Sequence, residues 1–183
     1  MRWIWIDKFL EFESGRRARA IKNVSLAEEH LHDHFPGFPV MPNSLIVEGL
    51  AQTGGLLVGE HNHFEEKVVL AKLPKAVFYF PAVPGDQLIY TTTVQDINDA
   101  GAMVTATSHV GDRLQAEMEI VFAHLKEDEQ ATASRGRSLF EPKNFVFTLK
   151  LLGVFEVGRA ADGTKLPEPP GLSMLKAGGG LFG

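Results

Sequence analysis

The spacing of hydrophobic positions changes along the chain and divides it into elements. Residues 7–13 and 17–24 alternate only roughly between apolar and polar, and we interpret them as two strands. Residues 44–59 are apolar around nearly the whole helical circumference, which predicts a buried helix. Strand-like segments rich in β-branched and apolar residues follow at 68–73, 76–80, 87–96, 103–110 and 114–125.

One long buried helix followed by consecutive strands indicates an α+β domain. A sheet curled around the helix would explain why the helix is apolar on nearly every side. Glycine lowers helix propensity by about 1 kcal/mol relative to alanine, so its repeated use needs a reason. We interpret the helical glycines as points where strands approach closely; they are Gly49, Gly54, Gly55 and Gly59.

A narrow polar line runs along this helix. Its members are spaced by four, four and three positions and share one face: Ser44, Glu48, Gln52 and Gly55. Glu48 is the only charged residue between Asp33 and Glu60. A carboxyl group in an apolar helix costs free energy unless it is paired, protonated or used. Glu48 is therefore the first candidate for chemistry.

The segment just before the helix is stiff and begins with a histidine. Residues 34–42 read His-Phe-Pro-Gly-Phe-Pro-Val-Met-Pro, with proline at every third position. Each proline restricts its own φ and the residue before it, which predicts an extended segment. We expect the helix to begin at Asn43 or Ser44, since both residue types can cap a helix. His34 then lies near the helix that carries Glu48.

Composition narrows the class of protein. A length of 183 residues predicts one domain with room for an appendage, and 44% apolar with 22% charged residues is ordinary for a globular protein. The absence of cysteine excludes disulfides, thiolate zinc sites and a cysteine nucleophile. A net charge of -5 argues against broad nucleic-acid binding. We find no signal-peptide core or membrane-spanning segment and predict a cytoplasmic protein.

The chain changes character after residue 125. We expect a main domain at 1–125, and a linker with a C-terminal extension, partly irregular, at 126–183. Residues 126–138 have no apolar period, and residues 167–183 are rich in proline and glycine. Residues 145–152 are apolar enough to be a strand or a short helix, and the run is too short to decide. We interpret the extension as a loosely attached appendage.

Two separated motifs resemble the 3-hydroxyacyl-[acyl-carrier-protein] dehydratases of type II fatty acid synthesis. The first is residues 34–42 with Glu48 and the run 51–55, and the second is residues 81–88, Pro-Ala-Val-Pro-Gly-Asp-Gln-Leu. The resemblance covers roughly residues 5–125. It implies a hot-dog fold, in which an antiparallel sheet wraps around one long buried helix. It also implies an acyl carrier protein as the partner that carries the substrate, and no metal or redox cofactor.

The resemblance places the catalytic histidine on His34 and its acidic partner on Glu48. A glutamate at the acidic position resembles the branch that dehydrates without isomerising. The family binds the thioester carbonyl through a backbone N–H that usually belongs to glycine, and here that residue is Asn43; Asp33 also replaces a frequent glycine. The resemblance further implies homodimers with shared sites, His34 of one chain facing Glu48 of its partner, and a possible trimer of dimers.

The chemistry agrees with these roles. Dehydration needs a base at the α-carbon, an acid for the departing hydroxyl, and donors for the charge on the thioester oxygen. His34 suits the base because imidazole is largely neutral at pH 7, and Glu48 suits the acid when burial keeps it protonated. We expect Asn43 and Ser44 at the helix N-terminus to bind the carbonyl, and Gln52 to orient the carboxyl or a water.

Other interpretations remain open at this level. A thioesterase on the same fold would use similar residues, and a non-catalytic acyl-carrier or lipid-binding module would bind without turnover. His30, His32 and His34 alternate and would share one side of a strand, but no carboxylate is recruited to them and we predict no metal site. Phe80 and Tyr90 fit either a tunnel mouth or the core.

A basic cluster near the N-terminus has two interpretations. It consists of Arg16, Arg17, Arg19 and Lys22. An acidic acyl carrier protein would dock on such a cluster. A solvated strand face explains the same residues equally well.

Overall fold

The computed structural model describes residues 3–64, 67–125 and 142–168. In chain order the elements are β1 (Lys8–Glu13), β2 (Arg17–Asn23), α1 (His30–Asp33), α2 (Asn43–His61), β3 (Lys67–Phe78), β4 (Gln87–Asn98), β5 (Gly101–Val110), β6 (Arg113–Leu125), α4 (Pro142–Leu151), α5 (Val154–Val157) and β7 (Gly158–Arg159). No helix in these described ranges is long and apolar enough to cross a membrane.

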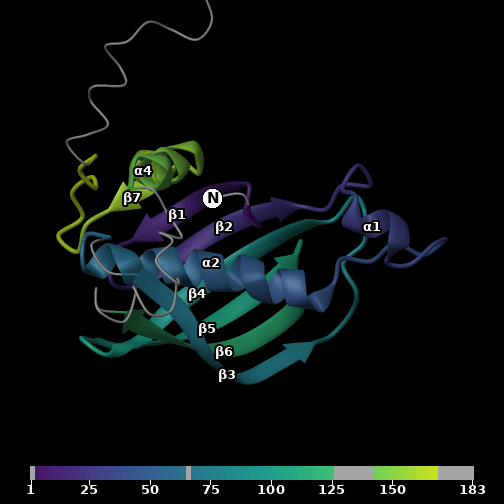
Figure 1. Cartoon of the computed structure of the whole chain (residues 1–183), viewed down its shortest axis with the longest axis horizontal. Helices are drawn as coiled ribbons and strands as arrows, with labels where there is room; N and C mark the ends of the chain where they lie inside the picture. Colours follow the sequence, from purple (N-terminus) through teal and green to yellow (C-terminus); the bar gives the residue numbers. More distant parts are fainter. Residues whose placement is uncertain (1–2, 65–66, 126–141, 169–183) are drawn as a thin grey trace, which may run out of the picture.

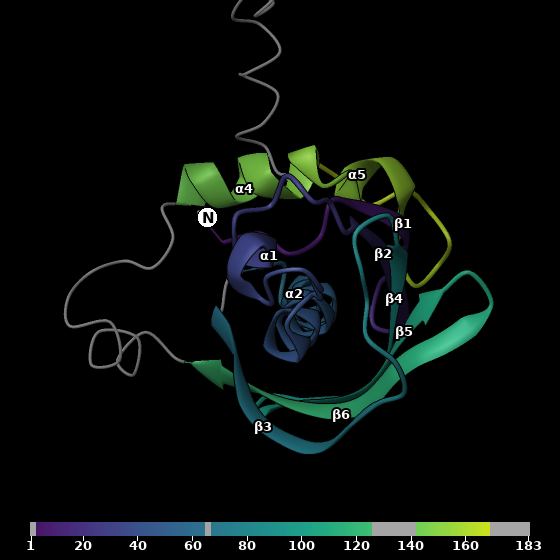
Figure 2. The same ribbon diagram turned by 90° about the vertical axis from the view of Figure 1, so that its right-hand side faces the viewer.

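One sheet wraps around the long helix, as the sequence predicts. The seven strands described here run in the order β3-β6-β5-β4-β2-β1-β7. Every neighbouring pair is antiparallel except β1 and β7, where Phe12 pairs with Gly158 in a parallel register. Figure 2 shows that the sheet curves around α2 on two sides. In Figure 1, α2 lies across the concave face of the sheet. The expected α+β, hot-dog arrangement is confirmed, with β7 as a short addition.

Strand alternation supplies the core around α2. In β6 the side chains of Ala116, Met118, Ile120 and Phe122 are buried, and the residues between them are more exposed. Successive side chains of a strand point to opposite faces, so this alternation turns one apolar face toward the helix. The expected strands at 68–73 and 76–80 form the single strand β3, whose register shifts beside Pro74 because proline has no N–H to donate.

The start of α2 lies where the sequence places it, but the capping is different. The helix begins at Asn43, and Pro42 occupies the N-cap position without a side-chain hydrogen bond. Neither Asn43 nor Ser44 caps the helix with its side chain, since both already lie inside it. The carbonyl of Pro42 accepts hydrogen bonds from Leu45 N at 2.9 Å and Ile46 N at 3.3 Å.

Gly49 allows α2 to approach β4 and the N-terminal segment. A Cβ at this position would collide with the ring of Tyr90 and lie 2.9 Å from the carbonyl oxygen of Trp5. Tyr90 is fully buried, so it belongs to the core and not to a tunnel mouth. The interpretation of Gly49 as a point of close approach is confirmed.

We expect Gly49→Ala to destabilise the protein by about 1–3 kcal/mol, because the added methyl overpacks the contact with a buried ring and a main-chain oxygen. Urea unfolding followed by circular dichroism measures the change. Gly59→Ala is the matched control, since its Cβ would meet nothing closer than 3.5 Å and alanine favours the helix. Equal stability of Gly49→Ala and the wild type would contradict the packing argument.

The C-terminal part packs on the sheet instead of hanging loosely. Residues 145–151 lie in the helix α4, and residue 152 follows its end, which settles the choice between strand and helix. Leu149, Leu152, Val154 and Phe155 are buried, and the carbonyl of Leu152 accepts a 2.8 Å hydrogen bond from Phe9 N. The expected loose appendage is therefore wrong for residues 142–168, which cover β1 (Figure 1). The division at residue 125 stays a prediction, and residues 126–141 and 169–183 lie outside the described ranges.

Candidate active site

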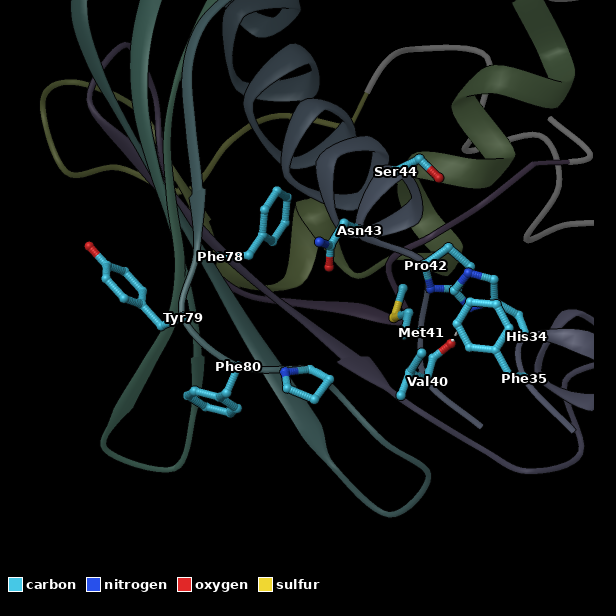
Figure 3. A pocket seen from close by; sticks show the side chains of 11 residues that line it. His34, Phe35, Val40, Met41, Pro42, Asn43, Ser44, Phe78, Tyr79 and Phe80 are labelled. Carbon is cyan, nitrogen blue, oxygen red and sulfur yellow. Dashed lines mark hydrogen bonds between the residues drawn. The ribbon is translucent and has the colours of Figure 1, made fainter. Parts of the chain in front are cut away.

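A pocket of about 650 Å³ opens between the start of α2 and the end of β3. One wall is the segment from His34 to Ser44, of which His34, Phe35 and residues 40–44 line the space. The opposite wall is formed by residues 78–81 (Figure 3). Phe80 lies in this wall, which favours the tunnel-mouth interpretation of this residue over the core interpretation. The pocket thus brings a histidine, a helix N-terminus and aromatic side chains together.

The loop that carries His34 is closed on itself. Phe35 and Phe38 exchange two main-chain hydrogen bonds of 3.1 and 2.9 Å, and Val40 N donates to His34 O at 2.8 Å. The positive φ of Gly37 (78°) completes this tight turn. The segment is therefore a hydrogen-bonded turn, and the expectation of an extended segment is wrong for residues 34–38. These hydrogen bonds set the position of His34 before substrate arrives.

Hydrogen bonding defines the tautomer of the His34 ring. Its Nδ1 lies 2.9 Å from the carbonyl oxygen of Val40, and its ring stacks on Phe35 with 4.4 Å between centroids. A carbonyl oxygen only accepts, so Nδ1 of the neutral ring carries the proton. Nε2 then has a free lone pair, which is what a general base needs.

The first turn of α2 offers free hydrogen-bond donors to the pocket. Asn43 and Ser44 are exposed, and both line the pocket. Among the described residues, no acceptor meets their backbone N–H groups, while Leu45 N and Ile46 N already donate to Pro42. Unpaired N–H groups at a helix N-terminus attract negative charge. This end of α2 can therefore stabilise a carbonyl oxygen that becomes negative.

Glu48 and Gln52 lie away from the pocket of their own chain. Neither is among the residues that line it. Both are half-buried on the next turns of α2, and Gln52 Nε2 donates a 2.8 Å hydrogen bond to Glu48 Oε1. A single chain thus lines one pocket with His34, Asn43 and Ser44, and Glu48 is absent from that lining.

Sequence reasoning missed the partners of Gln52. Its Oε1 accepts a 2.8 Å hydrogen bond from Trp5 N, and its Nε2 donates to Trp3 O at 2.7 Å. These partners are 47 and 49 positions away in the chain. Main-chain groups carry no side-chain signal, so no sequence pattern marks them.

The three alternating histidines have three separate surroundings. They lie at the short helix α1, where alternate positions do not share a face. His32 Nε2 lies 3.0 Å from the Leu26 carbonyl, and the His30 ring meets the Trp5 ring edge-on at 5.1 Å. Burial lowers the pKa of His30 below the usual histidine value. No group of three or more His, Cys, Asp or Glu side chains suited to a metal ion occurs in the described ranges.

Carboxylates neutralise the basic cluster on β2. Arg16 pairs with Glu13 at 2.6 Å, and Arg17 and Arg19 both reach Glu11, at 3.0 and 3.8 Å. Lys22 is buried and pairs with Glu28 at 2.6 Å. These contacts favour a paired strand face over a free docking surface.

A protein-family model described as the FabA-like domain matches residues 3–122. A curated relative from Pelotomaculum thermopropionicum, named 3-hydroxyacyl-[acyl-carrier-protein] dehydratase FabZ, is 38% identical over 122 residues, covering 66% of this chain and 87% of that protein. A second, from Koribacter versatilis and with the same name, is 39% identical over 117 residues, covering 63% and 75%.

Solved structures at lower identity share the fold. The conserved protein PA5202 from Pseudomonas aeruginosa superposes with a TM-score of 0.54 at 19% identity, covering 64% of this chain and 87% of that one. Smu.793 from Streptococcus mutans, solved with acetyl CoA, gives 0.53 at 15% identity and the same coverage. At these identities the likeness concerns the fold alone.

Proposed function

The chain belongs to the family of FabA-like domains, and from this membership we infer that it is a 3-hydroxyacyl-[acyl-carrier-protein] dehydratase. It is a lyase of fatty acid synthesis that removes water from 3-hydroxyacyl-[acyl-carrier-protein] and leaves the trans-2-enoyl thioester. The observation that supports this chemistry best is the free Nε2 of His34 in a pocket that also receives the N-terminus of α2.

In the proposed mechanism His34 Nε2 removes a proton from the α-carbon of the substrate. The electron pair of that C–H bond forms the new double bond, and negative charge builds on the thioester oxygen during the step. The backbone N–H groups of Asn43 and Ser44 stabilise this oxygen. Glu48 gives a proton to the departing 3-hydroxyl, which leaves as water.

We propose that His34 and Glu48 work together across a homodimer. Glu48 does not line the pocket of its own chain, so a partner must supply the acid if both residues act. The outer edge of β3 has no neighbour among the described strands; Leu70 on this strand and Tyr79 directly after it are exposed. An open edge with apolar side chains is suited to pairing with another chain. The trimer of dimers and the cytoplasmic location remain predictions from the sequence.

A hydration assay tests the function. The enzyme run in reverse should consume trans-2-enoyl-[acyl-carrier-protein], with loss of the enoyl absorbance and appearance of the 3-hydroxyacyl product by mass spectrometry. Release of free carrier thiol would instead identify a thioesterase. Binding of acyl carriers without turnover at any chain length would identify a non-catalytic module and refute the dehydratase assignment.

Besides the basic cluster on β2, the chain has another candidate contact for the acyl carrier protein, at the rim of the pocket. The guanidinium of Arg113 lies 4.1 Å from the centroid of the Phe80 ring, and Phe80 lines the pocket. Arg113 is exposed and is absent from the ion pairs found among the described residues. An unpaired cation at the rim of a pocket suits an acidic partner, because it steers association and costs no broken ion pair.

We expect Arg113→Glu to raise KM for acyl-[acyl-carrier-protein] by about 3- to 10-fold, since the change replaces attraction with repulsion at the rim. Steady-state kinetics at low salt measure the effect, and a short carrier-free thioester should show no change. Arg16→Glu is the matched control, because Arg16 is already paired with Glu13 on β2. An equal rise in KM for both thioesters would exclude carrier docking at Arg113.

A further inference from the structure

Three hydrogen bonds hold the Gln52 amide between the N-terminal segment and Glu48. Trp5 N donates to Gln52 Oε1 at 2.8 Å, and Gln52 Nε2 donates to Trp3 O at 2.7 Å and to Glu48 Oε1 at 2.8 Å. All three partners lie within normal hydrogen-bond distance. Every N–H of the side-chain amide therefore has an acceptor.

The main chain decides which way this amide points. A backbone N–H can only donate, so the atom that faces Trp5 N must be the oxygen of Gln52. A backbone carbonyl can only accept, so the atom that faces Trp3 O must be the nitrogen. A flipped amide would lose both contacts. Gln52 can consequently only donate to Glu48, and Glu48 Oε1 must accept.

The N-terminal segment is itself held by side-chain packing. The Trp5 ring meets His30 edge-on at 5.1 Å and Trp3 edge-on at 5.6 Å, and Lys22 Nζ lies 5.9 Å from its centroid. Trp5 is half-buried, although Trp3 is 61% exposed. Aromatic contacts of this kind stabilise the position of the segment. The two main-chain groups that orient Gln52, Trp3 O and Trp5 N, therefore belong to a segment whose position is fixed by packing.

We propose that Gln52 is a positioning residue, held by the main chain of Trp3 and Trp5, that presents Oε2 of Glu48 as the oxygen that protonates the leaving hydroxyl. This inference rests on the proposed role of Glu48 as the acid. The two oxygens of a free carboxyl group exchange places by rotation about one bond. With Oε1 engaged by Gln52, the proton of the acid sits on Oε2, which has no hydrogen-bond partner among the described residues.

Replacing Gln52 with methionine should separate positioning from binding. Methionine has a similar length and favours helices, but it cannot hold the carboxyl. We expect kcat for enoyl hydration to fall about 10- to 100-fold with KM within about 2-fold of wild type, because small misplacement of a catalytic group is costly. Gln95→Met is the matched control; Gln95 is exposed on β4, and we expect wild-type kinetics.

Hydrogen exchange tests the hydrogen bond between Trp5 N and Gln52 Oε1 without measuring enzyme activity. The chain has only two tryptophans, so ¹⁵N-tryptophan labelling leaves two backbone amide signals. In the wild type the Trp5 amide should be protected from hydrogen exchange by Gln52 Oε1. In Gln52→Met it should exchange at least about 10-fold faster, since its acceptor is gone. The Gln95→Met control should leave the Trp5 amide protected.

The outcomes separate this inference from the function itself. An unchanged kcat in Gln52→Met, a rise in KM alone, or an unaltered Trp5 amide would overturn the positioning role. Gln52→Glu is the second variant if methionine prevents folding; it keeps an acceptor for Trp5 N but has no N–H to donate to Glu48 or Trp3 O, and kcat should fall at least as far. An inactive wild type would refute the proposed function, whereas full activity in Glu48→Gln would refute the role of the acid.

Discussion

Replacing His34 with alanine is expected to lower kcat for dehydration by about 10²- to 10⁴-fold, because the base that takes the α-proton is lost. Glu48→Gln should reduce kcat by a similar factor, since an amide keeps the shape of the side chain but has no acidic proton. Both variants should retain wild-type unfolding transitions. Steady-state kinetics of enoyl hydration provide the measurement.

Matched controls make this result specific. His32→Ala removes an exposed histidine two positions from His34, and Glu119→Gln makes the same carboxyl-to-amide change on β6. Both controls should keep near wild-type kcat. If His34→Ala and Glu48→Gln also keep near wild-type rates, the assignment of base and acid is wrong, while the dehydratase function would still stand.

Mixing the two inactive variants, His34→Ala and Glu48→Gln, should restore part of the dehydratase activity. In a dimer of one His34→Ala chain and one Glu48→Gln chain, one of the two shared sites has both changes and the other has neither. Random exchange makes half of the dimers mixed, so about one quarter of wild-type activity should return. The physical reason is that each site draws its base and its acid from different chains.

The recovery is measured after co-refolding or co-expression with separately tagged chains, followed by purification of the mixed dimer. Its expected turnover is about half that of the wild-type dimer. Two preparations of the same variant, carried through the same procedure, are the control and should remain inactive. Absence of recovery in a purified mixed dimer would show that His34 and Glu48 do not meet across the interface.

The local elements of this fold are readable from the sequence because their causes are local. Hydrophobic period predicts α2 and the strands, and the polar line through Glu48 and Gln52 depends only on residues three or four apart. The stiff segment after His34 follows from proline in the same way. The family motifs occur in these same segments, which is why the resemblance identifies the family from residues that are already physically unusual.

The C-terminal part shows where such reasoning fails. Residues 145–152 carry an apolar run too short to distinguish helix from strand, and nothing in it indicates that Leu152 O would accept a hydrogen bond from Phe9. The contact depends on which surface of the sheet remains uncovered after β1 has formed. That surface is a property of the assembled sheet.

By itself the sequence determined most strands of the main domain, the buried helix with one polar line, and the choice of His34 and Glu48 as candidates. Only the tertiary structure decided the rest: the wall at residues 78–81, the separation of Glu48 from the pocket of its own chain, and the anchoring of Gln52 by the N-terminal main chain. The physical reason is the separation in sequence of the residues that interact. Helix and strand periods act over a few residues, whereas these contacts join segments tens of residues apart, and they exist only once the sheet has closed around α2.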